Sequence, residues 1–187
     1  MTNPKLIEAA MAVLQTAGSL NVTVLNKALF YLDLVALRDI GQTVTGQTYM
    51  ALAAGPVIAK YDKRLVAALV DQGLATQADA GKSKPLTVNV GMTAFRNLSE
   101  PELEHARKLG RWAAGQTATK VSDLSHENLG WKTAYAAGLG SKGPKKAAMP
   151  IDLNLALQQV ADADPWMDEP VAPTIVKLDA TPTVPWL

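Results

Sequence analysis

The feature that most constrains this chain is a strongly apolar helical pattern that begins at Leu25 and is closed by glycine. Five apolar residues recur at helical spacing and would form one broad buried stripe: Ala28, Leu29, Leu32, Val35 and Ala36. Gly41 ends the predicted helix, because glycine adopts the left-handed closing conformation without steric cost. A polar turn at 43–46 follows, and Gly55-Pro56 ends the next segment. This pattern predicts a scaffold, and it contains no catalytic arrangement of residues.

The remaining periodicity predicts a compact, mainly α-helical domain with one small antiparallel β-hairpin. Ser99 and Glu102 have the spacing of a capping box at a helix start, and Ser125 is expected to cap a helix that begins at His126. Residues 49–53 are too few for periodicity to separate a strand from a helical turn. The expected helices span 4–17, 21–40, 59–73, 99–114, 117–124, 125–137 and 152–163, and the hairpin strands span 74–76 and 86–90.

The chain changes character near its C-terminal end. Five of its eleven prolines lie within residues 164–187, and proline cannot donate to the hydrogen-bond ladder of a helix or a sheet. We therefore expect a folded domain over residues 1–163 and a proline-rich, extended tail over 164–187.

Composition excludes several classes of protein. The 18 basic and 17 acidic residues give a formal charge of +1, which is not the electrostatic signature of a dedicated nucleic-acid-binding protein. The absence of cysteine excludes disulfides, thiol catalysis and thiolate metal sites. No apolar run is long enough to cross a bilayer. We expect a cytoplasmic protein that needs no metal and no cofactor, and that does not associate with a membrane.

Two blocks of sequence carry a resemblance to a known family. The first is Lys27-Ala28-Leu29-Phe30-Tyr31-Leu32-Asp33, continued by Gly41, Val44-Thr45-Gly46, Tyr49, Ala51-Leu52 and Gly55-Pro56. The second is Val121-Ser122-Asp123-Leu124-Ser125-His126-Glu127, with Trp131 four residues further on. In this order, across residues 5–137, they resemble the Panacea domain, the SocA-like antitoxin family. One departure is Ala53-Ala54, where members often carry a basic or aromatic residue before the glycine-proline pair.

The resemblance implies a largely helical antitoxin of bacteria or phages that neutralises a cognate toxin by direct binding. Some relatives look like adaptors that deliver the toxin to a protease, so a protease is a second implied partner. The family pairs with many toxins, and the identity of the toxin does not carry over. If the position of Ala53-Ala54 contacts the partner, that contact is altered in this chain.

The residues expected to bind the partner come from both blocks and from the tail. Trp112 and Trp131 also fit a buried core at helical spacing, whereas Trp166 and Trp186 lie where burial is less expected. The full set of candidates is Lys27, Tyr31, Tyr49, Asp123, His126, Glu127, Trp131 and Trp166.

The adjacent pair His126 and Glu127 has the residue types of a general base or a metal site. Neighbouring helical residues point about 100 degrees apart, so the two side chains would not face each other. A zinc site of the HExxH type needs a histidine at position 130, where this chain has Gly130. The favoured interpretation is a helix cap with Glu127 at the positive helix end and His126 bonded to a neighbouring loop.

A second hypothesis comes from the basic stripe Lys60, Lys63 and Arg64, which precedes a hairpin bearing Lys82 and Lys84. A winged helix has this order of elements: a helix, a turn, a second helix and a basic wing. The second hypothesis is therefore a DNA-binding regulator. In this helix Leu65, Val66, Leu69 and Val70 are expected to face inward. The near-neutral total charge argues against nucleic acid as a partner. An enzyme is the third hypothesis, and no nucleophile elbow, phosphate loop or metal-ligand spacing supports it.

Overall fold

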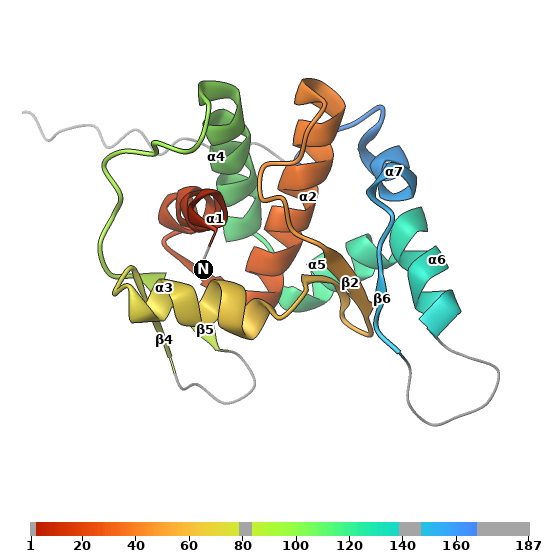
Figure 1. Ribbon diagram of the computed structural model, residues 1–187, viewed down its shortest axis with the longest axis horizontal. Coiled ribbons are helices and arrows are strands. Elements are labelled where there is room, and N and C mark those ends of the chain that lie inside the picture. The colour runs from red at the N-terminus through yellow and green to blue at the C-terminus, as the bar shows by residue number, and fades with distance from the viewer. Residues whose placement is uncertain (1–2, 79–83, 139–146, 168–187) are drawn as a thin grey trace, which may run out of the picture.

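The structure is a computed structural model that describes residues 3–78, 84–138 and 147–167 (Figure 1). The helices are α1 (Pro4–Ala17), α2 (Val22–Ile40), α3 (Ala67–Asp71), α4 (Glu100–Ala114), α5 (Ala118–His126), α6 (Leu129–Gly138) and α7 (Leu153–Ala156). A π-helical turn, η1 (Asp62–Val66), leads into α3, and a 3₁₀ turn, η2 (Leu157–Val160), continues α7. In the described part of the chain, no helix has the length and apolar character needed to span a membrane.

Two small antiparallel sheets accompany the helices. One has the strand order β1-β5-β4 and the other β3-β2-β6. Each sheet joins distant parts of the chain. Ser19 of β1 lies opposite Thr87 of β5, and Met149 of β6 lies opposite Ala51 of β2. The strands are β1 (Ser19–Asn21), β2 (Tyr49–Leu52), β3 (Gly55–Ile58), β4 (Ala75–Gln77), β5 (Pro85–Val88) and β6 (Met149–Pro150).

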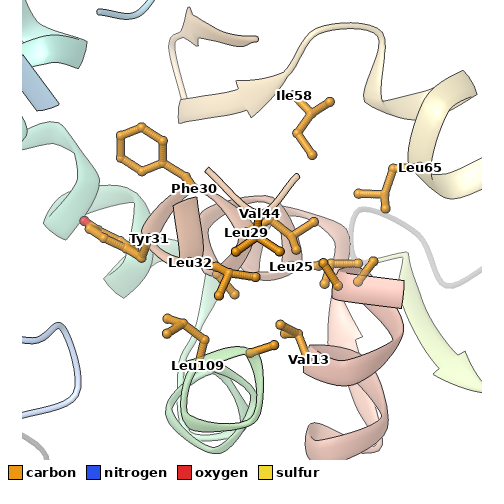
Figure 2. Close-up of a cluster of buried hydrophobic side chains, with 14 of the residues drawn as sticks. Val13, Leu25, Leu29, Phe30, Tyr31, Leu32, Val44, Ile58, Leu65 and Leu109 are labelled. Atoms are coloured by element: carbon orange, nitrogen blue, oxygen red, sulfur yellow. The ribbon is translucent and has the colours of Figure 1, made fainter. Parts of the chain in front are cut away.

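Helix α2 is the centre of the core. Every residue from Val24 to Ala36 is buried, so this helix is enclosed on all sides, as expected for one that is apolar around most of its circumference. Side chains of α1, α4 and η1 surround it, and Figure 2 shows Val13, Leu109 and Leu65 directed toward Leu25, Leu29 and Leu32. The same burial encloses three polar residues of α2, namely Asn26, Lys27 and Asp33.

The mainly helical fold predicted from the sequence is confirmed, and so are the locally encoded helix ends. Asn21 caps α2, because its Oδ1 accepts from the backbone N–H of Thr23 at 2.7 Å. Gly41 closes the same helix at φ 80°. The capping box of Ser99 and Glu102 is present at the start of α4.

Several boundaries differ from the prediction. The structure has two three-stranded sheets where one hairpin was expected, and Gly55-Pro56 opens β3 instead of ending a segment. The helix expected over 59–73 begins only at Asp62, and its Val70 is 39% exposed although it was expected to face inward. The helix expected over 152–163 is reduced to α7 and η2.

The prediction that Ser125 caps a helix is wrong. Helix α5 continues through Ser125, whose Oγ donates to the carbonyl of Ser122 within the same helix. Near the start of α6, the backbone N–H of Trp131 instead donates to Oδ1 of Asn128 at 3.1 Å. Glu127 therefore follows the C-terminal end of α5 and precedes the first residue of α6, Leu129, so it is not in the first turn of a helix as predicted. The boundary between the folded domain over 1–163 and the extended tail over 164–187 stays a prediction. Trp186 and Lys82 lie outside the described residues.

Candidate functional site

The two sequence blocks meet at the turn between β2 and β3. Trp131 on α6 donates from Nε1 to the carbonyl of Leu52 at 3.0 Å, and Ser122 on α5 donates to the carbonyl of Ala54 at 3.1 Å. We call this meeting point the hairpin junction and define it by Leu52, Ala54, Ser122 and Trp131. It brings residues separated by about 70 positions in the sequence into direct contact.

Gly55 lies at the base of the hairpin junction, where the packing leaves no room for a side chain. A Cβ on this residue would overlap Ser125 Oγ from the second block and Lys27 Cε from the first. Its φ of 96° also lies in the region that favours glycine. The glycine of the glycine-proline pair is therefore required by both the backbone and the close approach of α2 and α5.

Lys27 is buried beneath this glycine. Its side chain has no exposed surface, and its Nζ has no hydrogen-bond partner among the described residues. Burial lowers the pKa of the Lys27 amine to about 7, because the charged form loses its hydration. Lys27 cannot touch a partner in this conformation, although the sequence analysis named it as a candidate binding residue.

Asp33 and Tyr49 form a buried polar network that fixes the turn after α2. The Asp33 carboxylate accepts from the backbone N–H groups of Val44 and Thr45, each at 2.8 Å, and from the hydroxyls of Thr45 and Tyr49. Burial raises the pKa of Asp33, and the four donors oppose that rise. Burial also raises the pKa of Tyr49, and the nearby Asp33 charge adds to the effect. The network satisfies a carboxylate inside the core, so Tyr49 serves the fold and is not exposed to a partner.

Tyr31 links α2 to the segment that follows the second block. Its hydroxyl donates to Gln159 Oε1 at 3.3 Å, and Asn128 donates from Nδ2 to the same oxygen at 2.9 Å. Gln159 in turn donates to the carbonyl of Leu124 at 2.9 Å. Burial raises the pKa of the Tyr31 hydroxyl. Tyr31 is thus a structural link under η2, not an exposed binding residue.

His126, Trp131 and Tyr135 form a stack of rings beside the hairpin junction. The His126 and Trp131 rings are 4.3 Å apart at an interplanar angle of 22°, and Trp131 and Tyr135 are 4.6 Å apart at 14°. Glu127 is exposed and pairs with Lys132 at 2.7 Å, which lowers the pKa of its carboxyl. Asp123 is also exposed. The two neighbours His126 and Glu127 therefore have separate partners, Trp131 and Lys132.

The three tryptophans in the described residues divide as the core interpretation predicted. Trp112 and Trp131 are buried, and Trp112 meets the edge of Tyr31 at 5.6 Å between ring centroids. Trp166 is half-buried at a separate place, with Lys108 Nζ 6.0 Å from its ring centroid. The hairpin junction therefore does not include Trp166.

Three exposed apolar side chains lie on the elements that the hairpin junction joins. Six large apolar residues are exposed among those described, and Leu52, Leu124 and Leu129 are three of them, at 38%, 38% and 43%. They come from β2, the end of α5 and the start of α6. We call these three residues the leucine surface. Sequence reasoning did not find it, because exposure of a single leucine leaves no signal in the pattern.

Asn128, Gln159 and Asp33 are further residues that the sequence did not single out. Asn128 and Gln159 lie in segments with no motif, and only the folded chain brings them together. Asp33 did leave a signal, since it is a carboxylate in the middle of an apolar helical stripe and needs buried donors. In the described residues, no group of three or more histidine, aspartate or glutamate side chains is placed to hold a metal ion.

The fold and the site define a helical scaffold whose two sequence blocks are joined at one short hairpin. The profile of the family described as "Antitoxin SocA-like, Panacea domain" matches residues 25–132, which is more than half of the chain. The chain belongs to this family, which associates it with toxin–antitoxin systems in general. No curated protein and no solved structure gave a match. Both blocks and the whole leucine surface lie inside the matched range, whereas α1, β6, α7 and η2 lie outside it.

Proposed function

We propose that this protein neutralises a cognate toxin by binding it directly, that it acts in the cytoplasm, and that it has no catalytic activity of its own. Family membership supports the toxin as the kind of partner. The leucine surface supports the place of contact, because it is the apolar area on the elements that the two family blocks bring together. An interface of about 800 Å² on each partner is enough for a stable complex.

The predicted binding residues contribute to this proposal in two ways. Asp123 and Glu127 are exposed next to the leucine surface and are available for direct contact. Lys27, Tyr31 and Tyr49 are buried, so they would act only by holding the hairpin and α2 in place. His126 and Trp131 support the surface from beneath through their ring stack and the bond to Leu52.

A growth-rescue assay tests the proposal. The chain is co-expressed with the product of a neighbouring gene that is lethal alone, and Leu52→Asp is compared with Val90→Asp. Val90 is a matched control, because it is an apolar residue that is 62% exposed and follows β5, which belongs to the sheet that does not contain the β2–β3 hairpin. We expect Leu52→Asp to lose rescue and Val90→Asp to keep it, with unchanged melting of both. Equal rescue by both variants would place the contact elsewhere.

The same assay separates occlusion from delivery to a protease. If the antitoxin acts by occlusion, the toxin persists in rescued cells as part of a complex. If it acts as an adaptor, the toxin level falls during rescue, and removal of the protease abolishes rescue. We favour occlusion as the simpler action of a preformed surface.

A further inference from the structure

The first half of the chain follows the plan of a winged-helix domain. The order α1, β1, α2, η1–α3, β4, β5 is helix, strand, helix, helix, strand, strand, and the sheet order β1-β5-β4 places the first strand beside the last. The sequence indicated the two final strands but not β1, whose pairing with β5 completes this plan. One departure is the β2–β3 hairpin, which is inserted between α2 and η1. Figure 1 shows α3, β4 and β5 together on the lower side of the molecule.

Four basic side chains are exposed where the third helix of this plan, η1–α3, begins and where the last strand, β5, begins. Lys63 and Arg64 lie in η1, Lys60 lies just before it, and Lys84 immediately precedes β5. We call them the basic cradle. Lys84 lines a cavity of about 330 Å³ together with Tyr61 and Asp62, the two residues that follow Lys60, so the start of β5 and the start of η1 face the same cavity. No ion pair joins any of the four to an acidic residue within the described ranges.

The charge of the cradle is local and is not reflected in the net charge of the chain. The cavity includes one carboxylate, Asp62, among its lining residues. Asp71 lies at the other end of α3, where it lines a different cavity. The balance around the start of η1 is therefore four basic groups to one acidic group, although the chain as a whole carries only +1. A duplex backbone is attracted to such a local excess through its phosphates.

We infer that the basic cradle binds duplex DNA through phosphate contacts. The winged-helix plan favours duplex DNA over an acidic protein. In this plan a helix and a wing lie side by side, so the helix can enter a DNA groove while the wing contacts the backbone beside that groove. Asp62 opposes the phosphates and weakens the binding. The inference does not depend on toxin neutralisation, since the cradle and the leucine surface share no residue.

Fluorescence anisotropy with a labelled duplex of about 20 base pairs tests this inference on the full chain. We expect binding at about 50 mM salt that falls with salt at a log–log slope of roughly −3 to −4, as four phosphate contacts would give. The double variant Lys60→Glu with Lys63→Glu should weaken binding at least about tenfold. Asp62→Asn should tighten it, because one repulsive charge is removed.

The control reverses two exposed lysines of α5 and α6, Lys120→Glu with Lys132→Glu, and changes the net charge by the same amount. This control should bind within about twofold of the unaltered chain at the same salt. Absence of binding at low salt would overturn the inference. Equal weakening by the cradle variant and its control would also overturn it, because binding would then follow net charge alone. Binding of an acidic protein but not of DNA would contradict the assignment to nucleic acid.

Discussion

The Nε1 of Trp131 donates a 3.0 Å hydrogen bond to the carbonyl of Leu52, and this bond fastens the second sequence block to the hairpin of the first. Among the described residues, no other tryptophan donates a hydrogen bond from its indole to this hairpin. The ring stack with His126 and Tyr135 holds the indole in the orientation that the bond requires. The position of Leu52 on the surface thus depends on a residue 79 positions away.

Trp131→Phe removes this donor and keeps an aromatic ring for the stack. We expect a loss of about 1–2 kcal/mol in the free energy of unfolding, the usual cost of leaving a hydrogen-bond acceptor without its partner. Urea denaturation measures the change, with the exposed Thr119→Ala on α5 as the control. If both variants unfold at the same urea concentration, the bond contributes nothing to stability.

Gly55→Ala should be more damaging than Gly46→Ala, although both glycines have positive φ. The added Cβ at Gly55 overlaps Ser125 and Lys27, whereas at Gly46 the nearest atom is Asn3 Nδ2 at 4.0 Å. We expect a loss of about 2–4 kcal/mol at Gly55 and about 1 kcal/mol at Gly46, where only the backbone is strained. Thermal melting compares the two, and similar melting temperatures would show that the close approach at Gly55 relaxes at little cost.

Lys27 should make stability depend on pH. Its folded pKa of about 7 lies below the ordinary 10.5, so between these values the unfolded chain holds a proton that the folded chain does not. Stability should therefore rise with pH in this window, by up to about 1.4 kcal/mol per pH unit from this group. Lys27→Met, which removes the buried amine, should be more stable than the unaltered chain near pH 7, and its advantage should shrink toward pH 10.

Lys132→Met is the control for this pH series, because Lys132 is exposed on α6. The difference between this control and the unaltered chain should stay nearly constant across the window. A pH-independent difference for Lys27→Met as well would mean that Lys27 stays protonated in the folded protein.

Asp33→Asn should weaken the turn after α2, because an amide cannot accept from all four donors that surround the carboxylate. We expect a loss of about 2–4 kcal/mol, and about 1–2 kcal/mol for Tyr49→Phe, which removes one donor. The double variant should lose less than the sum, since both changes disrupt one network. Additive losses measured by denaturation would contradict a shared network.

How far the sequence predicted the fold depended on how local each signal was. The helix ends that were predicted correctly are encoded by residues within a few positions of each end. Pro4 marks the start of α1, Asn21 and Gly41 mark the two ends of α2, and the capping box of Ser99 and Glu102 marks the start of α4. Strands β1 and β6 have three and two residues, and they exist only because distant strands pair with them. No periodicity can reveal so short a strand.

The candidate site shows the same limit. The sequence identified the right blocks but placed Lys27, Tyr31 and Tyr49 on a binding surface, because burial of a polar side chain depends on elements that are distant in sequence. Ser125 has the residue type of a helix cap, yet its hydroxyl bonds within α5 and Asn128 performs that role. Leu52, Leu124 and Leu129 lie on elements that come together only when α5 and α6 dock on the hairpin.

The most direct measurement is co-purification of the chain with the lethal product of its neighbouring gene, followed by size-exclusion chromatography. We expect a complex that elutes as one species, that persists with Val90→Asp and that separates with Leu52→Asp. Full rescue of growth without any complex, at an unchanged toxin level, would contradict neutralisation by direct binding.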